Sequence, residues 1–225
     1  MGTPPRTGCI VVAAGAGSRL GADRPKAYVD LAGRPILDHA LRGVLDVPGI
    51  TRIVVVAPAS HVDTTVDRWA HEPRIAVVAG GAQRTDSVAA GLAALGECDV
   101  VLVHDAARCL TPRSVFERVT AAVVAGAAAA IPGLPVVDTI KVVDSDGHVV
   151  ATPDRASLRA VQTPQGFTPE ALRRAHAGGS VATDDAALVE ALGLLVVVVD
   201  GDPRALKITT PDDLTRAEAL LEDPV

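Results

Sequence analysis

Short apolar runs rich in Val and Ile alternate along the chain with amphipathic stretches of helical length. This alternation is typical of parallel strands that crossover helices bury on both faces. The expected strands are Cys9–Ala13, Arg52–Ala57, Ile75–Ala79, Val100–His104, Ala127–Ile131 and Leu194–Val199. The expected helices are Ile36–Leu45, Ser60–Trp69, Arg84–Leu95, Pro112–Ala125, Pro169–Ala177, Asp184–Leu192 and Pro211–Leu221. The sequence therefore predicts a doubly wound, mostly parallel sheet.

Three of the expected helices begin at a Thr-Pro pair. The pairs are Thr111-Pro112, Thr168-Pro169 and Thr210-Pro211. Threonine can cap the free amides of the first turn, and proline at the first helical position loses no hydrogen bond. We expect each of these threonines to be the N-cap of its helix.

The stretch from Pro135 to Phe167 interrupts the alternation. Two β-rich runs, Val136–Val143 and His148–Ala151, flank Ser145-Asp146-Gly147, and Asp-Gly between such runs indicates a hairpin. A hairpin with no covering helix must pack on its own domain or on a partner subunit, and the second arrangement gives a homodimer. The expected fold class is α/β, a Rossmann-like doubly wound sheet with an inserted β-hairpin arm at 135–160.

Length and composition restrict the class of protein further. The 225 residues are 48% hydrophobic and 21% charged, which suits a single domain over 1–225 with a sizeable core. The formal net charge is -6, so we expect no face that binds nucleic acid. Lysine occurs only at Lys26, Lys141 and Lys207, while the remaining basic residues are arginines. A chain this acidic must concentrate its cations locally if it binds phosphates.

The cysteines and the longest uncharged run bear on the compartment. Cys9, Cys98 and Cys109 are odd in number and form no Cys-x-x-Cys pair, which favours a reducing cytoplasm. The uncharged run from Thr120 to Val137 is mostly Ala and contains Gly and Pro. We therefore expect the end of a helix and a strand there, and no membrane span.

A glycine-rich segment follows the first expected strand. It reads Ala13-Ala14-Gly15-Ala16-Gly17-Ser18-Arg19-Leu20-Gly21, and Pro25-Lys26 follows. Backbone amides in such a turn can approach an anion closely, which is how α/β proteins bind phosphates. Gly21 comes one residue too late for the dinucleotide fingerprint, and no Gly-Lys stands where a P-loop needs it. Amides, Arg19 and Lys26 together would neutralise a triphosphate; the alternative is a βα turn with two solvated cations.

Further motifs follow in order along the chain. They are GGAQRTDSV at 80–88, VHDAAR at 103–108, DTIK at 138–141, TPQGF at 163–167, TDDA at 183–186 and LKIT at 206–209. Together with the first loop they resemble the 2-C-methyl-D-erythritol 4-phosphate cytidylyltransferase family from about Cys9 to Leu221. The chain departs from the usual family pattern at Cys109, where proline is common.

The resemblance implies a reaction and a cofactor. The chain would transfer the cytidylyl group of CTP to 2-C-methyl-D-erythritol 4-phosphate and release pyrophosphate, a step of non-mevalonate isoprenoid biosynthesis. Asp105 follows a central strand, where open α/β sheets place ligand chemistry, and a carboxylate beside a triphosphate suits Mg²⁺. The resemblance implies the same metal role for Asp105. An Asx turn is the alternative use of this residue.

The resemblance also implies roles for individual residues. The catalytic residues would be Arg19, Lys26 and Lys207, which hold the nucleotide phosphates. The nucleotide-binding residues would be Ala13, Ala14, Gly15, Gly81, Ala82, Ser87 and Ala106. The substrate-binding residues would be Asp105, Arg108, Thr139, Arg155, Thr163 and Thr183. Because Thr139 and Arg155 lie in the arm, the resemblance implies that each active site borrows them from the partner subunit of a homodimer.

Four side chains near these motifs carry structural expectations of their own. Lys207 is expected in a strand-like run, Ala205–Thr209, where a cation needs an anionic partner unless it points to water from an edge strand. Thr183 is expected to cap the helix that starts at Asp184. Arg84 is interpreted as a solvated or structural cation, and His104 as a strand-end histidine with satisfied hydrogen bonds.

Other functions remain open from the sequence alone. A cytidylyltransferase for another alditol phosphate, such as ribitol 5-phosphate, would share the fold and the nucleotide motifs. A module that binds CTP without turnover is a second alternative, although Arg19, Lys26, Asp105 and Lys207 together argue against it. An NAD-dependent enzyme is disfavoured by the late Gly21 and by the lack of an acidic residue for the ribose.

Overall fold

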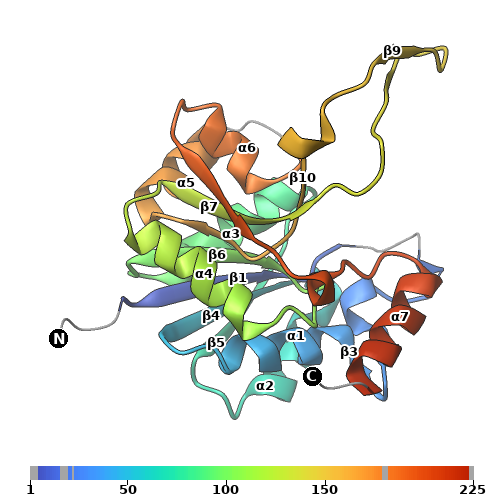
Figure 1. Ribbon diagram of the computed structural model, residues 1–225. Helices are drawn as coiled ribbons and strands as arrows, with labels where there is room; N and C mark the ends of the chain where they lie inside the picture. Colours follow the sequence, from blue (N-terminus) through green and yellow to red (C-terminus); the bar gives the residue numbers. More distant parts are fainter. Residues whose placement is uncertain (1–4, 16–19, 22, 179–181, 223–225) are drawn as a thin grey trace.

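The computed structural model describes residues 5–15, 20–21, 23–178 and 182–222. An eight-stranded sheet forms its centre (Figure 1). The strands of this sheet are β1 (Thr7–Val12), β4 (Ile50–Ala57), β5 (Ile75–Ala79), β6 (Val100–Asp105), β7 (Ala129–Pro135), β10 (Arg159–Val161), β11 (Gln165–Phe167) and β12 (Val196–Asp200). Their order is β10-β7-β11-β6-β1-β4-β5, and β12 also pairs with β7.

Most strand pairs in this sheet are parallel. β1 pairs in parallel with β4 and β6, β4 with β5, and β12 with β7. β10 and β11 are antiparallel to their neighbours and come from the segment that interrupts the alternation of strands and helices. The α/β fold class is therefore confirmed, with these two short strands as an antiparallel addition.

Helices cover both faces of the sheet. They are α1 (Ile36–Leu45), α2 (Val62–Trp69), α3 (Arg84–Leu95), α4 (Arg113–Val124), α5 (Pro169–Ala177), α6 (Asp185–Glu190) and α7 (Pro211–Glu222). Val11 and Leu102 pack in one apolar cluster with α1 and α4, whereas Ile10 and Val103 pack in a second cluster with α3, α5 and α6. Successive residues of a strand thus reach opposite helical layers, as the pleat requires.

The remaining elements are short. A two-stranded hairpin joins β2 (Asp30–Leu31) to β3 (Arg34–Pro35), and α7 packs near β2. Single turns of 3₁₀ helix are found at η2 (Lys26–Tyr28), η3 (Ala59–His61), η4 (Arg155–Ser157) and η5 (Pro203–Ala205). Two of these turns matter for the site, because η2 carries Lys26 and η5 precedes Lys207.

The predicted hairpin is present as an arm that projects from the body of the molecule (Figure 1). Its strands, β8 (Val142–Val143) and β9 (Val149–Ala151), pair only with each other and are shorter than the runs in the sequence indicated. Arg155 Nη1 donates a hydrogen bond to the carbonyl of Val137 at 2.8 Å and so ties the two sides of the arm together. The arm is thus a separate projection that the main sheet does not cover.

Several sequence predictions of local structure need correction. Lys207 does not lie in a strand: the chain after η5 is irregular. Thr111 does not cap α4, whose N-cap is Pro112, because its hydroxyl donates to the carbonyl of Arg108 instead. The α6 helix begins at Asp185 and not Asp184, and Asp184 caps it in place of Thr183. The cap at Thr168 is confirmed.

The cysteines are unpaired, and the longest uncharged run forms the elements that the sequence predicted. All three thiols are free, and burial raises the pKa of Cys109 to about 12. The uncharged run ends α4 and continues into β7, as predicted. Among the described residues no helix has the length and apolar character to cross a membrane.

Candidate active site

Two adjoining cavities open beside the carboxyl ends of β1, β5 and β6. The first, of about 310 Å³, is lined by Val12, Ala13, Ala14, Gly15, Lys26, Ala27, Gly81, Ala82, Gln83, Arg84, Ser87, Asp105 and Lys207. The second, of about 230 Å³, is lined by Arg84, Asp105, Arg108, Val161, Gln162, Thr163, Gln165, Thr183, Asp184 and Lys207. Arg84, Asp105 and Lys207 line both, and we call these three residues the junction.

Close packing of two loops shapes the wall of the first cavity. A Cβ atom on Gly80 would lie 2.5 Å from Cβ of Ala14 and 2.8 Å from Oγ of Ser87. A Cβ on Gly81 would lie 2.3 Å from Cβ of Asp86, the residue that closes the capping box of α3 with Gln83. Only glycine fits at these two positions, so the turn after β5 can lie directly against the loop after β1.

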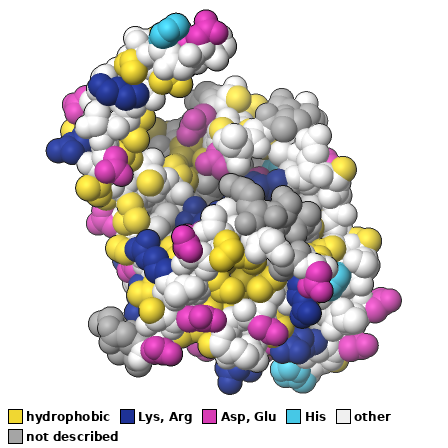
Figure 2. Space-filling model, turned by 90° about the vertical axis from the view of Figure 1, so that its right-hand side faces the viewer, with side chains coloured by type: hydrophobic (Ala, Val, Ile, Leu, Met, Phe, Trp, Pro, Cys, Tyr) yellow, Lys and Arg dark blue, Asp and Glu magenta, His cyan; other side chains and the backbone are white. Residues whose placement is uncertain are grey.

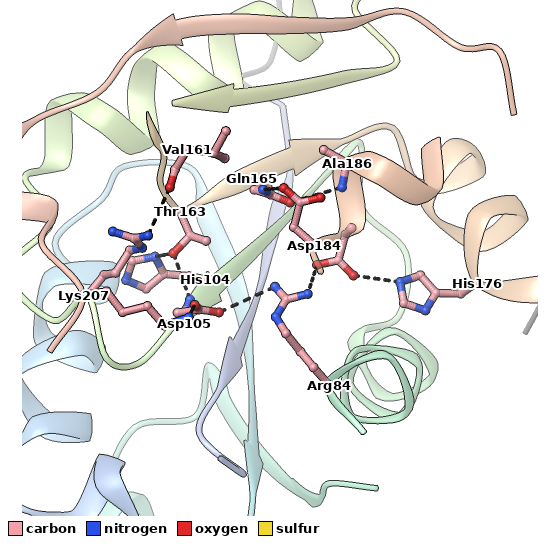
Figure 3. A network of polar contacts seen from close by, with 12 residues as sticks. Arg84, His104, Asp105, Val161, Thr163, Gln165, His176, Asp184, Ala186 and Lys207 are labelled. Atoms are coloured by element: carbon pink, nitrogen blue, oxygen red, sulfur yellow. Dashed lines mark hydrogen bonds and ion pairs between the residues drawn. The ribbon is translucent and has the colours of Figure 1, made fainter. Parts of the chain in front are cut away.

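Asp105 ends β6 and is the anionic centre of the junction. Its side chain is 12% exposed, and its Oδ2 accepts a hydrogen bond from Nζ of Lys207 at 2.6 Å. Oδ1 lies 3.6 Å from Nη2 of Arg84 (Figure 3). Burial alone would raise the pKa of Asp105, but the charges of Lys207, Arg84 and Arg108 outweigh it and lower the pKa to about 2. The carboxylate is therefore ionised at neutral pH.

Lys207 reaches the junction from an irregular loop that neighbouring side chains hold. Its side chain is 42% exposed, so the ammonium faces the cavities as well as Asp105. Gln162 donates to the carbonyl of Asp202 at 2.8 Å and accepts from its amide at 2.9 Å. Arg108 Nη1 donates to the carbonyl of Ala205 at 2.7 Å. Ile208, the next residue, donates its amide to the carbonyl of Ala107 at 2.9 Å. Lys207 is therefore fixed by side chains and this single backbone hydrogen bond, and not by strand pairing as the sequence predicted.

Arg108 brings a positive charge to the second cavity, and its hydrogen-bond partners among the described residues are carbonyl oxygens. Its guanidinium donates to the carbonyls of Ala205 and Val161, and its buried Nε has no hydrogen-bond partner among the described residues. Burial lowers the pKa of Arg108, and the charge of Asp105 opposes this shift. Because carbonyl partners carry no net charge, the second cavity suits an anion such as a phosphate.

A histidine and a threonine hold the end of β6. The amide of Asp105 donates to Oγ1 of Thr163 at 3.0 Å, and that oxygen lies 3.1 Å from Nδ1 of His104. Burial lowers the pKa of His104 to about 4, so the ring is neutral at pH 7 and its Nδ1 can accept from the threonine hydroxyl. His104 is thus a satisfied strand-end histidine, as predicted.

Arg84 lies in the wall of both cavities, which its sequence interpretation did not include. Its side chain is 25% exposed, and Nη1 donates to Oδ2 of Asp185 at 2.6 Å. Burial would lower the pKa of Arg84, but the charges of Asp185 and Asp105 raise it. Of the two alternatives, the structural cation is therefore confirmed and the solvated one is wrong, and this paired group also lines both cavities. The sequence held one signal, since position 84 opens a helix directly after a glycine turn, where anions bind.

The structure brings most of the expected site residues together and leaves others apart. The cavities are lined by Ala13, Ala14, Gly15, Lys26, Gly81, Ala82, Ser87, Asp105, Arg108, Thr163, Thr183 and Lys207. Ala106 is buried and donates its amide to the carbonyl of Val12, and it lines neither cavity. Thr139 and Arg155 are exposed in the arm. Arg19 lies outside the described residues.

Several residues of the cavity walls were not expected from the sequence. Gln162, Gln165 and Asp184 line the second cavity, and Asp185 lies behind Arg84. Gln165 donates to Oδ2 of Asp184 at 2.9 Å and accepts from the amide of Ala186, so β11 holds the start of α6. Polar side chains inside the TPQGF and TDDA motifs were the available signal, because a buried polar group needs a partner.

The junction also bears on metal binding. An ionised carboxylate at the meeting point of two cavities fits Mg²⁺, which takes one or two protein carboxylates and completes its shell with phosphate oxygens and water. Asp105 is the residue that could hold it. In the described part of the chain, three potential metal ligands come together at Asp144, Asp146 and His148, on the exposed tip of the arm and not at the junction.

Comparison with known proteins agrees with this geometry. A family model described as 2-C-methyl-D-erythritol 4-phosphate cytidylyltransferase matches residues 8–223. The protein of that name from Rhodococcus jostii (strain RHA1) is 54% identical over 215 residues, which cover 95% of this chain and 94% of the relative.

Solved structures agree as well. The 4-diphosphocytidyl-2C-methyl-D-erythritol synthase of Anaerococcus prevotii DSM 20548 has a TM-score of 0.86 at 30% identity and covers 96% of both chains. The 2-C-methyl-D-erythritol 4-phosphate cytidylyltransferase of Thermus thermophilus has a TM-score of 0.77 at 36% identity and covers 95% of this chain and 98% of its own. The motifs lie at two cavities that share three residues, and the family model and the relatives match nearly the whole chain. The chain therefore belongs to the 2-C-methyl-D-erythritol 4-phosphate cytidylyltransferase family.

Proposed function

We propose that the chain transfers the cytidylyl group of CTP to 2-C-methyl-D-erythritol 4-phosphate, giving 4-diphosphocytidyl-2-C-methyl-D-erythritol and pyrophosphate. The observation that carries this proposal is the pair of cavities that meet at Asp105, Arg84 and Lys207. The first cavity, with its glycine turns, suits the nucleotide. The second, where the guanidinium of Arg108 donates to carbonyl oxygens and its buried Nε has no partner among the described residues, suits the phosphate of the acceptor. Two reacting groups held in these cavities would meet at the junction, which supports a transfer between them.

The reaction is an in-line displacement at the α-phosphorus of CTP. A phosphate oxygen of the acceptor forms the new P–O bond, while the bond from the α-phosphorus to the bridging oxygen breaks and pyrophosphate leaves with the electron pair. A phosphate monoester is already largely ionised near pH 7, since its second pKa is about 6, so no general base is needed. This agrees with a neutral, hydrogen-bonded His104.

The protein contributes positioning and positive charge. Lys207 would hold the α-phosphate as it crowds in the transition state, and Lys26 and Arg19 would hold the β- and γ-phosphates that leave as pyrophosphate. Mg²⁺ on Asp105 would neutralise phosphate charge when bound. Lysine suits the first task, because a compact ammonium on a flexible stem can follow a moving phosphate.

A homodimer with exchanged arms is the second part of the proposal. Thr139 and Arg155 are exposed in this chain and line neither cavity, although the family resemblance places them at the acceptor. The arm also exposes apolar side chains, with Val137 80%, Val143 54% and Val150 61% exposed (Figure 2). An exposed apolar patch favours docking on a partner. We infer that each arm completes the second cavity of the other subunit, in a cytoplasmic enzyme.

A pyrophosphate-release assay with CTP and Mg²⁺ tests the reaction. 2-C-methyl-D-erythritol 4-phosphate, ribitol 5-phosphate and no acceptor are compared at equal concentrations. We expect release with 2-C-methyl-D-erythritol 4-phosphate and little with the other two. Release with ribitol 5-phosphate alone would show a different acceptor, and CTP binding without release would show a nucleotide-binding module.

A further inference from the structure

Arg84 is held at the junction from behind by a buried carboxylate. Asp185, the first residue of α6, is fully buried, and its Oδ2 accepts from Nη1 of Arg84 at 2.6 Å. The other terminal nitrogen of Arg84, Nη2, lies 3.6 Å from Oδ1 of Asp105. The two terminal nitrogens of one guanidinium thus face two carboxylates: that of Asp185, which lines neither cavity, and that of Asp105, which lines both. Figure 3 shows the contact between Arg84 and Asp105.

Asp185 in turn has a second partner. Its Oδ1 lies 2.9 Å from Nε2 of His176, which stands in the last turn of α5 and whose side chain is 6% exposed. An ionised carboxylate only accepts hydrogen bonds, so Nε2 carries the proton in this contact. Burial of a carboxylate is costly unless its oxygens are paired, and here both oxygens have a partner. His176 therefore stabilises the position of Asp185, and Asp185 that of Arg84.

The series His176, Asp185, Arg84 and Asp105 links three helices to the end of β6. Arginine has several rotatable bonds, and a free Arg84 would lose entropy whenever it had to meet a substrate. Fixing one nitrogen on Asp185 removes much of that cost and leaves the rest of the guanidinium at the place where both cavities meet. The mechanism above assigns no task to His176 or Asp185, which touch neither cavity.

We propose that His176 and Asp185 are positioning residues that fix the guanidinium of Arg84 at the junction, where it donates to phosphate oxygens of the reacting pair. The inference rests on the proposed function and deepens it. It makes His176, which lies behind the cavities, a determinant of turnover and not of substrate affinity. A displacement of about 1 Å in such a group can cost up to ~10² in rate.

Four variants test this series of contacts, and the control variant changes another residue of α5, the helix that carries His176. H176L removes the donor to Asp185, and H176Q retains one with an amide nitrogen near the place of Nε2. R84A and the double variant R84A/H176L complete a double-mutant cycle. R174A is the control, because Arg174 is exposed on α5 and pairs only at 3.8 Å with Glu170. Turnover per folded site, the two KM values and the melting temperature are measured for each.

We expect H176L to lower kcat about 10-fold with both KM values within about twofold. H176Q should recover most of the loss, R174A should match the wild type, and H176L should lower kcat no further in the R84A background. A purely structural role would instead lower the melting temperature and leave kcat per folded site unchanged. If H176L does not fold, H176N gives the same test. The shorter amide of asparagine ends near the position of Nδ1, so it does not reach Asp185 as Nε2 does.

Failure of the inference and failure of the function are separable. If the wild type releases pyrophosphate and H176L has the same kcat, or if H176L lowers kcat by the same factor with and without Arg84, the positioning role is wrong. If the wild type releases none with either acceptor, the proposed function is wrong and the inference falls with it.

Discussion

At the junction, three charged side chains come from three separate parts of the chain, and each is held by further contacts. Asp105 is 12% exposed and contacts Lys207 and Arg84, and Arg84 is tied to Asp185. In the arm, by contrast, Thr139 and Arg155 are exposed, and the guanidinium of Arg155 donates a hydrogen bond to the carbonyl of Val137, in the arm itself. The junction is preorganised within one chain, whereas Thr139 and Arg155 of the arm line neither of the two cavities described above.

This contrast explains how one active site can draw on two kinds of structure. Groups that stabilise a transition state must be in place before the reaction, so they lie on rigid elements with buried supports. Groups that only bind an acceptor can arrive with a partner subunit, at the cost of ordering the arm on docking. Under this account, a change at the junction alters turnover, and a change in the arm alters assembly first.

Removal of Lys207 should have the largest effect on turnover. Lys207→Ala leaves Asp105 without its hydrogen-bonded cation and removes the charge proposed to hold the α-phosphate. By comparison with the loss of one preorganised donor, kcat should fall by ~10²–10³. Arg113→Ala is the control, because it also removes one cation but only from an exposed ion pair with Glu117. This variant should leave kcat unchanged. Near-normal turnover by the Lys207 variant would show that the junction does not drive the reaction.

Acid should destabilise the folded chain through His104. Burial lowers its pKa in the folded chain to about 4, while an unfolded histidine titrates near 6.5. Between pH 6.5 and pH 4, His104 therefore binds a proton in the unfolded chain but not in the folded chain. The contribution of His104 to the free energy of unfolding is complete above pH 6.5 and is lost as the pH falls to about 4. The expected loss is roughly 3 kcal/mol. Asp105 stays ionised through this window because its pKa is about 2.

The measurement is the free energy of unfolding in urea between pH 7 and pH 4. His104→Asn keeps an oxygen that can accept from Thr163 but has no titrating ring, so its stability should fall less steeply over the same range. Because the other titrating groups are shared, the difference between the two curves isolates His104. Parallel curves for the two proteins would contradict this assignment.

A charge on the arm should change assembly and leave the fold of the subunit almost untouched. Val143 lies in β8 and is 54% exposed, so Val143→Asp should shift the protein from dimer to monomer in sedimentation experiments. The free energy of unfolding of the monomer should change by less than ~0.5 kcal/mol, as for other surface substitutions. Val66→Asp is the control: Val66 is 45% exposed on α2, outside the arm, and its change should leave the dimer intact. Equal behaviour of the two variants would argue against docking through the arm.

Hydrophobic pattern predicted most of the fold. Helices α1, α3 and α5 match their predicted bounds, and β5 does as well. Apolar periodicity indicates α1 and α5. Glycines limit β5 and α3 instead, because Gly80-Gly81 stands between them and Gly96 follows α3. β10 and β11 were not predicted: each has three residues, and β11 reads Gln-Gly-Phe, a sequence with little strand signal. Tertiary pairing with β6 and β7 determines them, and that pairing leaves no local pattern.

The same limit applies to the site. Motifs identified Lys26, Asp105 and Lys207, because glycine turns and strand ends have recognisable neighbours in the sequence. The role of Arg84 depends on Asp185, which lies 101 positions away. No local pattern contains such a contact, so a solvated and a paired arginine look alike in the sequence.

A heterodimer tests most directly whether junction and arm belong to one active site across two chains. Subunits carrying Lys207→Ala or Arg155→Ala, each with its own affinity tag, are co-expressed, and the mixed dimer is isolated and assayed. If the arms cross, one of its two sites joins an intact junction to an intact arm, and the dimer retains about half of wild-type turnover while both parent homodimers are nearly inactive. If the mixed dimer is as inactive as its parents, each arm serves its own chain and the account is contradicted.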